Sequence, residues 1–363
     1  MANPHVQVIG GVDTHKHTHY TAAIDTNGRL LGHEEFPANA AGYAQLLEWL
    51  RSLGSIATVG VESSGSFGAT LTRFLRRAGE EVAEVNKPNR QARHMQGKSD
   101  RLDAEQIARA VLAGEGVGIP KTKSGPIEVI RMLRVARASA VRARTQAFNN
   151  LFGTMIGSPS EVRDELIDLT KRTFVNRCLG LEPETENLLE LIDEPDRLVT
   201  ASTKLTLRDL ARRWKTVDAE AKALGRQIQA VVQHVAPELV ELFGVSTELA
   251  GQFLVTAGDN PERIRNEAAF AKLCGACPKP ATSGLKNNRH RLNRSGDRSA
   301  NSALWIVAVV RLRHHEPTRD YVARRTAEGL SKREIIRCLK RYIAREVFAA
   351  LPRPQPEALP LAA

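Results

Sequence analysis

Residues 6–36 read VQVIGGVDTHKHTHYTAAIDTNGRLLGHEEF, and this stretch predicts the fold of the N-terminal part of the chain. Residues 6–12 form an apolar run, which is typical of a buried strand. Two more strand-like runs, 19–24 and 29–36, flank Asn27-Gly28, a dipeptide that favours the tight turn of a β-hairpin. The pattern therefore predicts three consecutive antiparallel strands.

From there to residue 112 the chain alternates between helix and strand patterns. In chain order they predict helix, strand, helix, strand and closing helix at residues 41–53, 57–62, 67–78, 81–85 and 100–112. Helical crossovers between the later strands make their pairing parallel. Three antiparallel strands followed by two parallel ones is the order of the ribonuclease H-like fold. We therefore predict an α/β domain of that type over residues 1–115.

Strand signals disappear after the Gly- and Pro-containing segment 114–126, and an all-α remainder is predicted. Residues 127–152 form a basic helix, with Arg131, Arg134, Arg137, Arg142 and Arg144 spread around it. Apolar residues then recur at alternating gaps of four and three, which predicts a coiled coil or a long antiparallel hairpin. They are Leu210, Trp214, Val217, Ala221, Leu224, Ile228, Val231 and Val235. The alternative is an ordinary helix packed on its own domain, whereas a coiled coil would provide a dimer.

The chain beyond this helix is predicted to form a mostly helical C-terminal domain. A segment rich in Gly, Pro, Asn, Ser and Arg interrupts it at residues 276–295, and we expect a functional loop there. The predicted division is a catalytic domain at 1–115, a helical and coiled-coil region at 116–244, a C-terminal domain at 245–350 and a disordered tail at 351–363.

The charge of the chain favours a polyanionic partner. Among 363 residues, 52 Lys and Arg exceed 41 Asp and Glu by 52 − 41 = 11, and 42% of the residues are hydrophobic. This composition is typical of a soluble globular protein, and its positive field favours nucleic acid over the alternative of a merely basic protein. No signal-peptide pattern or membrane-spanning run is present, so we expect a cytoplasmic, nucleoid-associated protein without membrane contact.

The four cysteines do not form the framework of a disulfide-stapled fold. Cys274 and Cys277 make one C-x-x-C, but a zinc site needs two further ligands at a matching spacing. Buried apolar thiols are therefore the favoured interpretation.

Four acidic residues are predicted to converge at one edge of the sheet. Asp13 ends the first strand and Glu62 ends the fourth, and these strands are neighbours in the predicted topology. Asp100 and Asp103 are three residues apart on one helix and so share a face. Four carboxylates suit Mg²⁺ or Mn²⁺, which can promote phosphoryl transfer on nucleic acid. The alternative for the two helical acids is stabilisation of the helix N-terminus without metal.

His15, His17 and His19 alternate just after Asp13, so they could face one side of a strand and bind metal. Surface histidines are the favoured interpretation, because no carboxylate or cysteine completes a compact ligand set among them.

A serine in the polar segment is a candidate nucleophile. Ser283 precedes a glycine and is followed by Lys286, Arg289, His290, Arg291, Arg294 and Arg298. A serine hydroxyl attacks phosphate usefully only where positive charge holds the phosphate and offsets the developing negative charge. Composition alone favours a plain phosphate-binding turn.

Several segments together resemble the insertion-sequence-110 family of DEDD transposases. They are GVDTHK (11–16), VESSG (61–65), VNKP (85–88), KSDRLDA (98–104), PKPATSG (278–284), RHRLNR (289–294) with GDR (296–298), and SKREIIR (331–337). They occur in order over nearly the whole chain, and their combination is highly specific.

The resemblance implies a Holliday-junction-resolvase-like (RuvC-type) N-terminal domain, a coiled-coil linker and a C-terminal transposase domain. Carried over by motif, Asp13, Glu62, Asp100 and Asp103 would bind divalent metal, and Ser283 would attack the DNA backbone. The resemblance also implies a bridge RNA that pairs with donor and target DNA. The protein would be a homo-oligomer, a dimer or a pair of dimers, with the two halves of each active site on different subunits.

Two positions depart from the family pattern. Family members often carry Ser-Ser-Gly where this chain has Thr282-Ser283-Gly284, which leaves Thr282 as an alternative nucleophile. His17 also stands where an acid is expected.

Three other functions compete with a recombinase. A metal-dependent junction nuclease would use the carboxylates without a covalent intermediate. An ATPase of the actin and sugar-kinase type shares the strand order. Its phosphate loop normally has a glycine soon after the acid of the first strand, whereas Asp13 here is followed by Thr-His-Lys. A non-catalytic nucleic-acid-binding scaffold would use only the basic surface.

Overall fold

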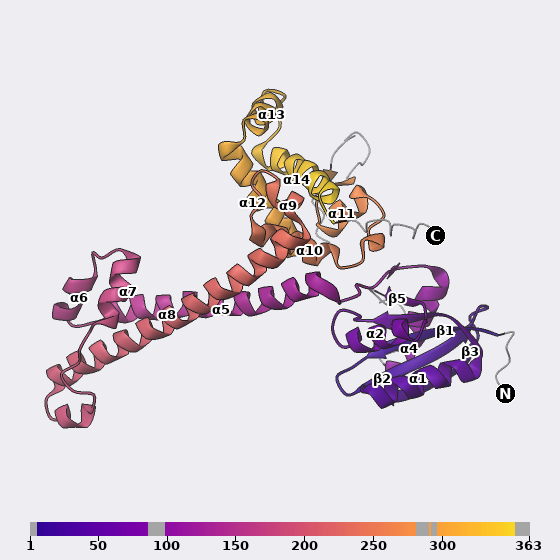
Figure 1. The fold of residues 1–363 in the computed structure, drawn as a ribbon, viewed down its shortest axis with the longest axis horizontal. Helices are drawn as coiled ribbons and strands as arrows, with labels where there is room; N and C mark the ends of the chain where they lie inside the picture. Colours follow the sequence, from indigo (N-terminus) through magenta and orange to yellow (C-terminus); the bar gives the residue numbers. More distant parts are fainter. Residues whose placement is uncertain (1–5, 86–98, 281–289, 292–295, 353–363) are drawn as a thin grey trace, which may run out of the picture. The chain divides into compact units, whose positions relative to one another are not determined.

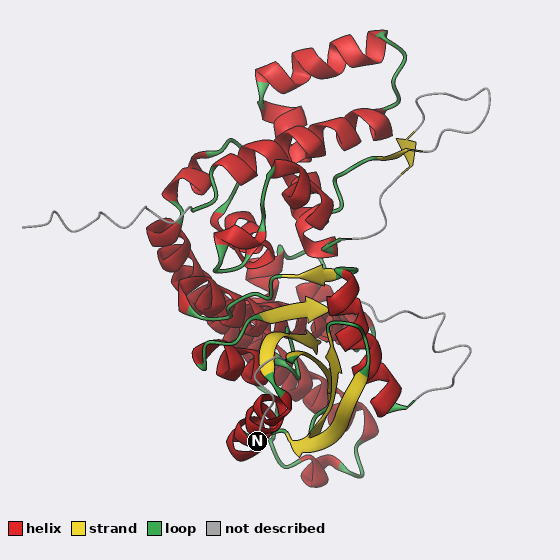
Figure 2. Ribbon diagram, turned by 90° about the vertical axis from the view of Figure 1, so that its right-hand side faces the viewer, coloured by secondary structure: helices red, strands yellow, loops and turns green. Residues whose placement is uncertain are grey.

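The computed structural model describes residues 6–85, 99–280, 290–291 and 296–352. The chain folds into two units. Of the described residues, the first unit takes those up to Gly125 and Thr256–Leu273, and the second takes Pro126–Val255 and those from Cys274 to Pro352. One large sheet lies in the first unit, and the second is almost entirely helical (Figure 2).

The first unit is built on a mixed sheet of six strands in the order β3-β2-β1-β4-β5-β6. The strands are β1 Gln7–Thr14, β2 Thr18–Asp25, β3 Leu30–Pro37, β4 Ser55–Glu62, β5 Val82–Val85 and β6 Val117–Gly118. β1, β2 and β3 pair antiparallel, whereas β4 is parallel to both β1 and β5. The five predicted strands are confirmed. The two-residue strand β6, which pairs antiparallel with β5, was not predicted.

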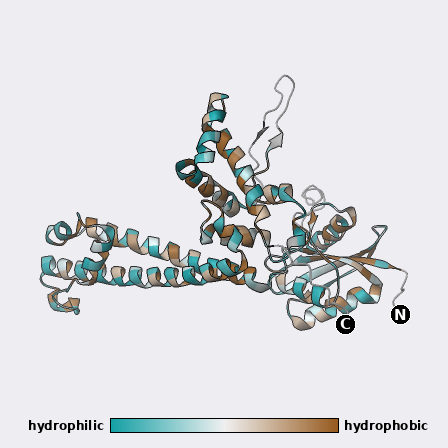
Figure 3. Ribbon diagram, turned by 45° about the horizontal axis from the view of Figure 1, so that its top comes forward, coloured by the Kyte–Doolittle hydropathy of each residue, from teal (hydrophilic) through white to brown (hydrophobic). Residues whose placement is uncertain are grey.

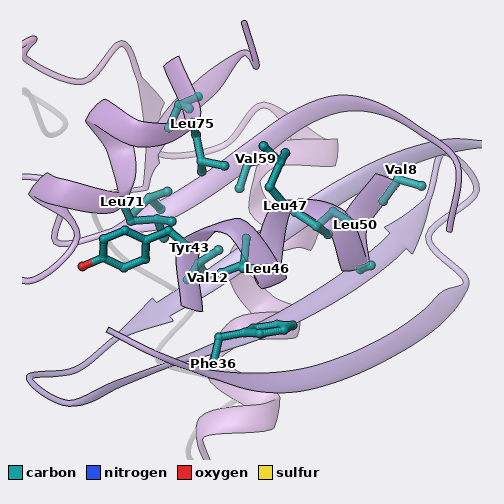
Figure 4. Packing of buried hydrophobic residues seen from close by; sticks show 13 residues of the cluster. Val8, Val12, Phe36, Tyr43, Leu46, Leu47, Leu50, Val59, Leu71 and Leu75 are labelled. Carbon is teal, nitrogen blue, oxygen red and sulfur yellow. The ribbon is translucent and has the colours of Figure 1, made fainter. Parts of the chain in front are cut away.

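Two helices, α1 (Ala40–Leu53) and α2 (Ala69–Arg77), cover one face of this sheet. Asn39 caps α1 by accepting a hydrogen bond from the backbone N–H of Gly42 at 2.9 Å. Side chains of α1, such as the fully buried Leu46, meet strand side chains such as Val8 in one apolar cluster (Figure 4). Burial of each large aliphatic side chain contributes about 1.5–3 kcal/mol, so this layer supplies much of the unit's stability.

Helix α4 (Asp100–Ala113) covers the opposite face and approaches the sheet most closely at two glycines. A Cβ atom on Gly60 would lie 2.6 Å from Val111 Cγ2, and Gly11 of β1 is more crowded still. Ala108 of α4 is fully buried in a small cluster with Ile9 and Ile24. The predicted closing helix is therefore confirmed, and glycines on β1 and β4 set how closely it approaches.

Residues well beyond the sheet in sequence also join the first unit. They include the short helices η2 (Pro261–Arg263) and α11 (Glu267–Leu273). Asn260 donates a hydrogen bond from Nδ2 to the carbonyl oxygen of Pro120 at 3.0 Å, and Arg263 donates from Nε to that of Ile119 at 3.0 Å. The predicted domain boundaries at residues 115 and 244 stay a prediction.

The second unit contains a long pair of helices, α5 (Gly125–Ile156) and α8 (Pro195–Val235), which lie side by side (Figures 1 and 3). The pair is antiparallel, since Arg137 of α5 lies beside Gly225 while Arg144, further along α5, binds Asp218, which comes earlier in α8. In the connection between the helices, α6 (Ser160–Leu166) and α7 (Lys171–Leu179) form a second apolar cluster with α5 and α8, and the short helix η1 (Leu188–Leu191) follows them.

The buried face of α8 is offset from the predicted heptad seam. The buried positions are Ala201, Leu207, Ala211, Asp218, Ala221, Ile228 and Val232. Only Ala221 and Ile228 belong to the predicted set, whose other members are half-buried beside this face. The predicted long antiparallel hairpin is present in the α5–α8 pair, whereas the role of the half-buried residues as a coiled-coil seam stays a prediction. The buried seam contains Asp218 and small alanines, and a pattern based on large apolar residues passes over these.

The remaining elements of the second unit follow α8. They are α9 Pro237–Glu241, α10 Thr247–Ala257, β7 Lys279–Pro280, β8 His290–Arg291, α12 Arg298–His314, α13 Glu316–Ala327 and α14 Lys332–Ala349. β7 and β8 pair antiparallel within the segment predicted to be a loop, so the prediction that strands end after the first domain was wrong there. Residues 353–363 of the predicted disordered tail lie outside the described residues. No helix in the described part of the chain is long and apolar enough to span a bilayer.

Candidate metal centre

Two of the predicted carboxylates lie at the same edge of the sheet. Val12 of β1 pairs with Val61 of β4 in parallel register, so Asp13 and Glu62 are the next residue on each strand. Asp13 is buried, with 7% of its surface exposed, and Glu62 is half-buried. The hydroxyl of Thr14 donates a hydrogen bond to the carbonyl oxygen of Glu62 at 3.0 Å, and this bond ties the two strand ends together.

The other two acids lie in the first turn of α4. Ser99 caps this helix, because its hydroxyl oxygen accepts a hydrogen bond from the backbone N–H of Leu102 at 3.3 Å. Asp103 is 2% exposed, whereas the side chain of Asp100 is 53% exposed. Both acids gain from the helix dipole, but Ser99 performs the capping for which an aspartate would otherwise be needed. An acid can interact with a helix dipole while it stays exposed to solvent, so this interaction does not explain why Asp103 is buried.

The structure brings a histidine between acids of the two elements. Nε2 of His15 lies 3.3 Å from Oδ2 of Asp13 and 3.6 Å from Oδ1 of Asp100. One potential ligand atom from each of these three residues lies within 4.8 Å of the others. Glu62 ends the strand beside that of Asp13, and Asp103 lies one turn beyond Asp100 on α4.

This donor set fits a divalent cation. Carboxylate oxygens bind Mg²⁺ and Mn²⁺, and an imidazole nitrogen adds a ligand that transition metals favour. Nε2 of His15 is inaccessible to solvent and makes no hydrogen bond, which is costly for a polar atom unless another partner completes it. Among the described residues, no other group of three His, Cys, Asp or Glu side chains has a spacing that suits a metal ion.

The serine segment is described only at its ends. Thr282, Ser283, Lys286, Arg289 and Arg294 lie outside the described residues. His290 and Arg291 form β8, where His290 pairs with Pro280 and Arg291 with Lys279 of β7. Arg298 is exposed at the start of α12, whose N-terminus is capped by Asp297.

A partly buried hydrogen-bond network holds the chain that leads into β7. The Nδ2 group of Asn301 donates to the carbonyl oxygens of Cys274 and Gly275, at 2.9 and 3.1 Å. Nζ of Lys340, from α14, donates to Oδ1 of Asn301 at 2.7 Å. Burial lowers the pKa of Lys340, and the nearby Arg337 lowers it further. The entry to the serine segment is therefore fixed by two helices.

Comparison with known proteins identifies the family. Residues 10–156 match a DEDD transposase family model of the IS110 type, and residues 236–323 match the model described as the transposase IS116/IS110/IS902 family. The chain belongs to the IS110 family of transposases. The two matches contain the acidic positions and the described ends of the serine segment, respectively.

Two curated relatives extend the IS110-family match over nearly the whole chain. The IS116 uncharacterized 44.8 kDa protein of Streptomyces clavuligerus is 22% identical over 97% of this chain and 96% of its own length. The IS110 uncharacterized 43.6 kDa protein of Streptomyces coelicolor is 23% identical over 95% of this chain and 94% of its own length.

The prediction of surface histidines was wrong for His19, whereas His17 is exposed and the His15 side chain is 44% exposed. The residues do not alternate along one strand, because His15 and His17 lie in the turn between β1 and β2. His19 is fully buried in β2 and stacks on Tyr43 with ring centroids 5.6 Å apart, and burial lowers its pKa. In this IS110-family chain His15 nevertheless lies in a compact group of potential metal ligands. Asp13 precedes it on β1, and Asp100 of α4, distant in sequence, completes the group.

Among the residues that the structure describes, neither Cys274 nor Cys277 belongs to a group of side chains with metal-binding spacing. Cys274 is fully buried and Cys277 is half-buried. Burial raises the pKa of the Cys274 thiol to about 12, which opposes formation of the thiolate that binds metal. The interpretation of Cys274 as a buried apolar thiol is confirmed.

Proposed function

We propose that this IS110-family transposase cuts and rejoins DNA by combining a divalent cation with a serine nucleophile. The cation would be Mg²⁺ or Mn²⁺, held by Asp13, Glu62, Asp100 and Asp103. One observation carries the proposal: Asp13 and Asp100, from a strand end and a distant helix, meet with potential ligand atoms within 4.8 Å of a shared histidine. When bound, the cation would polarise the scissile phosphate and offset charge on its oxygens.

The protein's own groups then have distinct roles. Asp13 is fixed at the end of a central strand and Asp103 is buried, so both carboxylates are held in place before substrate binds. The Ser283 hydroxyl oxygen would attack phosphorus, and the bond from phosphorus to the leaving deoxyribose oxygen would break. A phosphoserine ester results, and attack by another strand end on the same phosphorus releases the serine and joins the DNA.

Basic residues around the serine would bind the DNA backbone. They are Lys286, Arg289, His290, Arg291, Arg294 and Arg298. Arg and Lys contacts to phosphate hold DNA in register without reading its sequence. A structured bridge RNA that pairs with donor and target DNA would then supply the sequence specificity, as base pairing with a guide RNA does in other RNA-guided systems.

The architecture proposed for this activity follows the family pattern. The strand order of the first unit supports a ribonuclease H-like domain of the RuvC type, followed by a helical linker and a C-terminal transposase domain. We propose a homo-oligomer, a dimer or a pair of dimers, in which one subunit supplies the acids and another the serine. The half-buried apolar stripe beside the buried face of α8 supports a coiled-coil contact between subunits.

Trapping of a covalent adduct tests the nucleophile. The full-length protein, loaded with guide RNA and Mg²⁺, is incubated with labelled donor DNA, denatured and analysed by electrophoresis. We expect an adduct from wild type and from Thr282→Ala, but none from Ser283→Ala. An adduct from Ser283→Ala and none from Thr282→Ala would move the nucleophile to Thr282. DNA cutting by wild type without any adduct would instead favour a plain junction nuclease.

A further inference from the structure

His15 is placed as if to complete the cation site. Its Nε2 atom lies 3.3 Å from Asp13 Oδ2 and 3.6 Å from Asp100 Oδ1, yet it makes no hydrogen bond. The ring itself is 44% exposed, so the inaccessible nitrogen is the one directed at the carboxylates. The buried edge of the ring therefore faces the proposed metal site.

These distances suit metal ligands better than a hydrogen-bonded ion pair. A charge-assisted N–H···O bond is about 2.7–2.9 Å long and nearly linear. Two ligands of one small divalent cation, each bound at about 2.1 Å, lie about 3–4 Å from each other. The separations of His15 from both aspartates fall in the second range.

The backbone holds His15 in this position. It follows β1 in the tight connection to β2, where its N–H donates a hydrogen bond to the carbonyl oxygen of Thr18 at 3.1 Å. Asp13 is buried at the end of the same strand, two residues earlier. A short, hydrogen-bonded turn therefore presents the imidazole beside the carboxylate and facing the start of α4.

We infer that His15 supplies a nitrogen ligand to the cation held by Asp13 and Asp100, and that the site consequently discriminates in favour of transition-metal ions over Mg²⁺. This inference rests on the metal site of the proposed function. An imidazole nitrogen binds Mn²⁺ or Co²⁺ better than it binds Mg²⁺, which prefers oxygen and water. A purely acidic site lacks this source of selectivity.

Pulsed electron paramagnetic resonance of Mn²⁺ bound to the full-length, tag-free protein tests the nitrogen ligand directly. We expect a ¹⁴N hyperfine coupling in wild type that disappears in His15→Gln while Mn²⁺ remains bound. The matched control is His17→Gln, because His17 is exposed in the same turn and is expected to leave the coupling unchanged. Loss of the coupling in His17→Gln, or its persistence in His15→Gln, overturns the assignment.

Calorimetric titration gives a second readout that does not depend on activity. We expect His15→Gln to weaken Co²⁺ binding by about tenfold or more and to change Mg²⁺ binding by less than about threefold. Equal losses for both ions would mean that His15 acts only by orienting the carboxylates, and would overturn the inference.

The outcomes also separate this inference from the proposed function. If wild type binds Mn²⁺ through Asp13 but shows no nitrogen coupling, the inference fails and the proposed metal site stands. If wild type and Asp13→Asn bind Mn²⁺ equally well, the proposed site itself is wrong.

Discussion

The backbone of Gly11 lies against the carbonyl oxygen of Ala104, so closely that a Cβ atom on residue 11 would be 2.2 Å from that oxygen. The same Cβ would be 2.3 Å from the backbone nitrogen of Ala108. Helix α4 therefore rests on β1 at a point two residues before Asp13. This contact fixes how close Asp100, one turn before Ala104, comes to the end of the strand.

Replacing Gly11 with Ala is expected to push α4 away from the sheet. The new methyl group would meet backbone atoms, which cannot move aside as a side chain can, so we expect a destabilisation of about 2–3 kcal/mol. Mn²⁺ binding should also weaken by about tenfold or more, because displaced ligands lose geometry. Urea unfolding and calorimetry measure the two effects. Gly153→Ala is the control, since its Cβ would meet nothing within 4 Å; equal behaviour of the two variants would contradict the prediction.

Asp13→Asn is expected to lower the affinity for Mg²⁺ and Mn²⁺ by about tenfold or more while leaving the fold intact. The amide keeps the shape of the side chain but loses the negative charge that binds a hard cation. Calorimetry of the full-length protein provides the measurement, and circular dichroism checks the fold. Asp209→Asn serves as a control because this exposed acid lies on α8, in the second unit. Unchanged binding by Asp13→Asn would remove this residue from the site.

The Arg144–Asp218 pair is expected to stabilise the long helix pair in a pH-dependent manner. Desolvation raises the pKa of Asp218, but hydrogen bonds from Lys222 and Arg144 outweigh it, and the net shift is downward. A lowered pKa means that the stabilisation is complete above the pKa of the unfolded chain and is lost as the pH falls through the folded value. Asp218→Asn should lower the free energy of unfolding by about 1–2 kcal/mol at pH 7, a value between those typical of exposed and of buried ion pairs. The loss should be smaller in acid.

Urea unfolding of wild type and Asp218→Asn at pH 7 and below pH 4 measures this difference. The double variant with Arg144→Met shows whether the two residues are coupled. A stability difference that stays constant over this pH range would contradict the pairing.

Arg298→Ala is expected to weaken DNA binding uniformly across sequences. Arg298 is exposed at the start of α12, close to the serine segment. A lost phosphate contact reduces the slope of log K against log salt by about 1. Fluorescence anisotropy with a labelled duplex at several salt concentrations measures the slope. Arg77→Ala, which removes an exposed arginine from α2, should leave it unchanged; equal slopes in wild type and Arg298→Ala would exclude the contact.

Asn301→Ala is expected to slow covalent adduct formation more than it affects metal binding. It removes the two hydrogen bonds to the Cys274 and Gly275 carbonyls and leaves the buried Lys340 without its acceptor. We expect a loss of stability of about 1–3 kcal/mol. Single-turnover adduct formation, at a temperature where the variant is fully folded, should slow by about tenfold, with Mn²⁺ affinity unchanged. A normal adduct rate would show that the network does not position the serine segment.

The sequence predicted most of the first unit because its signals are local. Asn27-Gly28 specifies a hairpin, and apolar runs ending at Asp13 and Glu62 specify the strand ends that carry the acids. The seam of α8 was harder to predict, because the ion pair of Asp218 with Arg144 buries a charged residue at a position that a hydrophobic pattern rejects. The residues of the pair come from helices far apart in sequence.

The position of His15 beside Asp100 could not be predicted for a related reason. Its partner Asp100 lies on α4, and no pattern around residue 15 indicates that this helix returns to the end of β1. A signal did exist in Gly11, because a glycine on a buried strand often marks a close backbone approach. The short strands β7 and β8 gave no signal, since each is only two residues long.

Because Pro280 is paired with His290, the distance between Ser283 and the end of β7 has an upper limit. Ser283 is three residues beyond Pro280, and an extended chain gains at most about 3.6 Å per residue, so its Cα stays within about 11 Å of the end of β7 whatever path the chain takes. If Ser283 is the nucleophile, the phosphate that it attacks must therefore lie within reach of the β7–β8 pair, so the position of that pair decides which DNA bond can be cut.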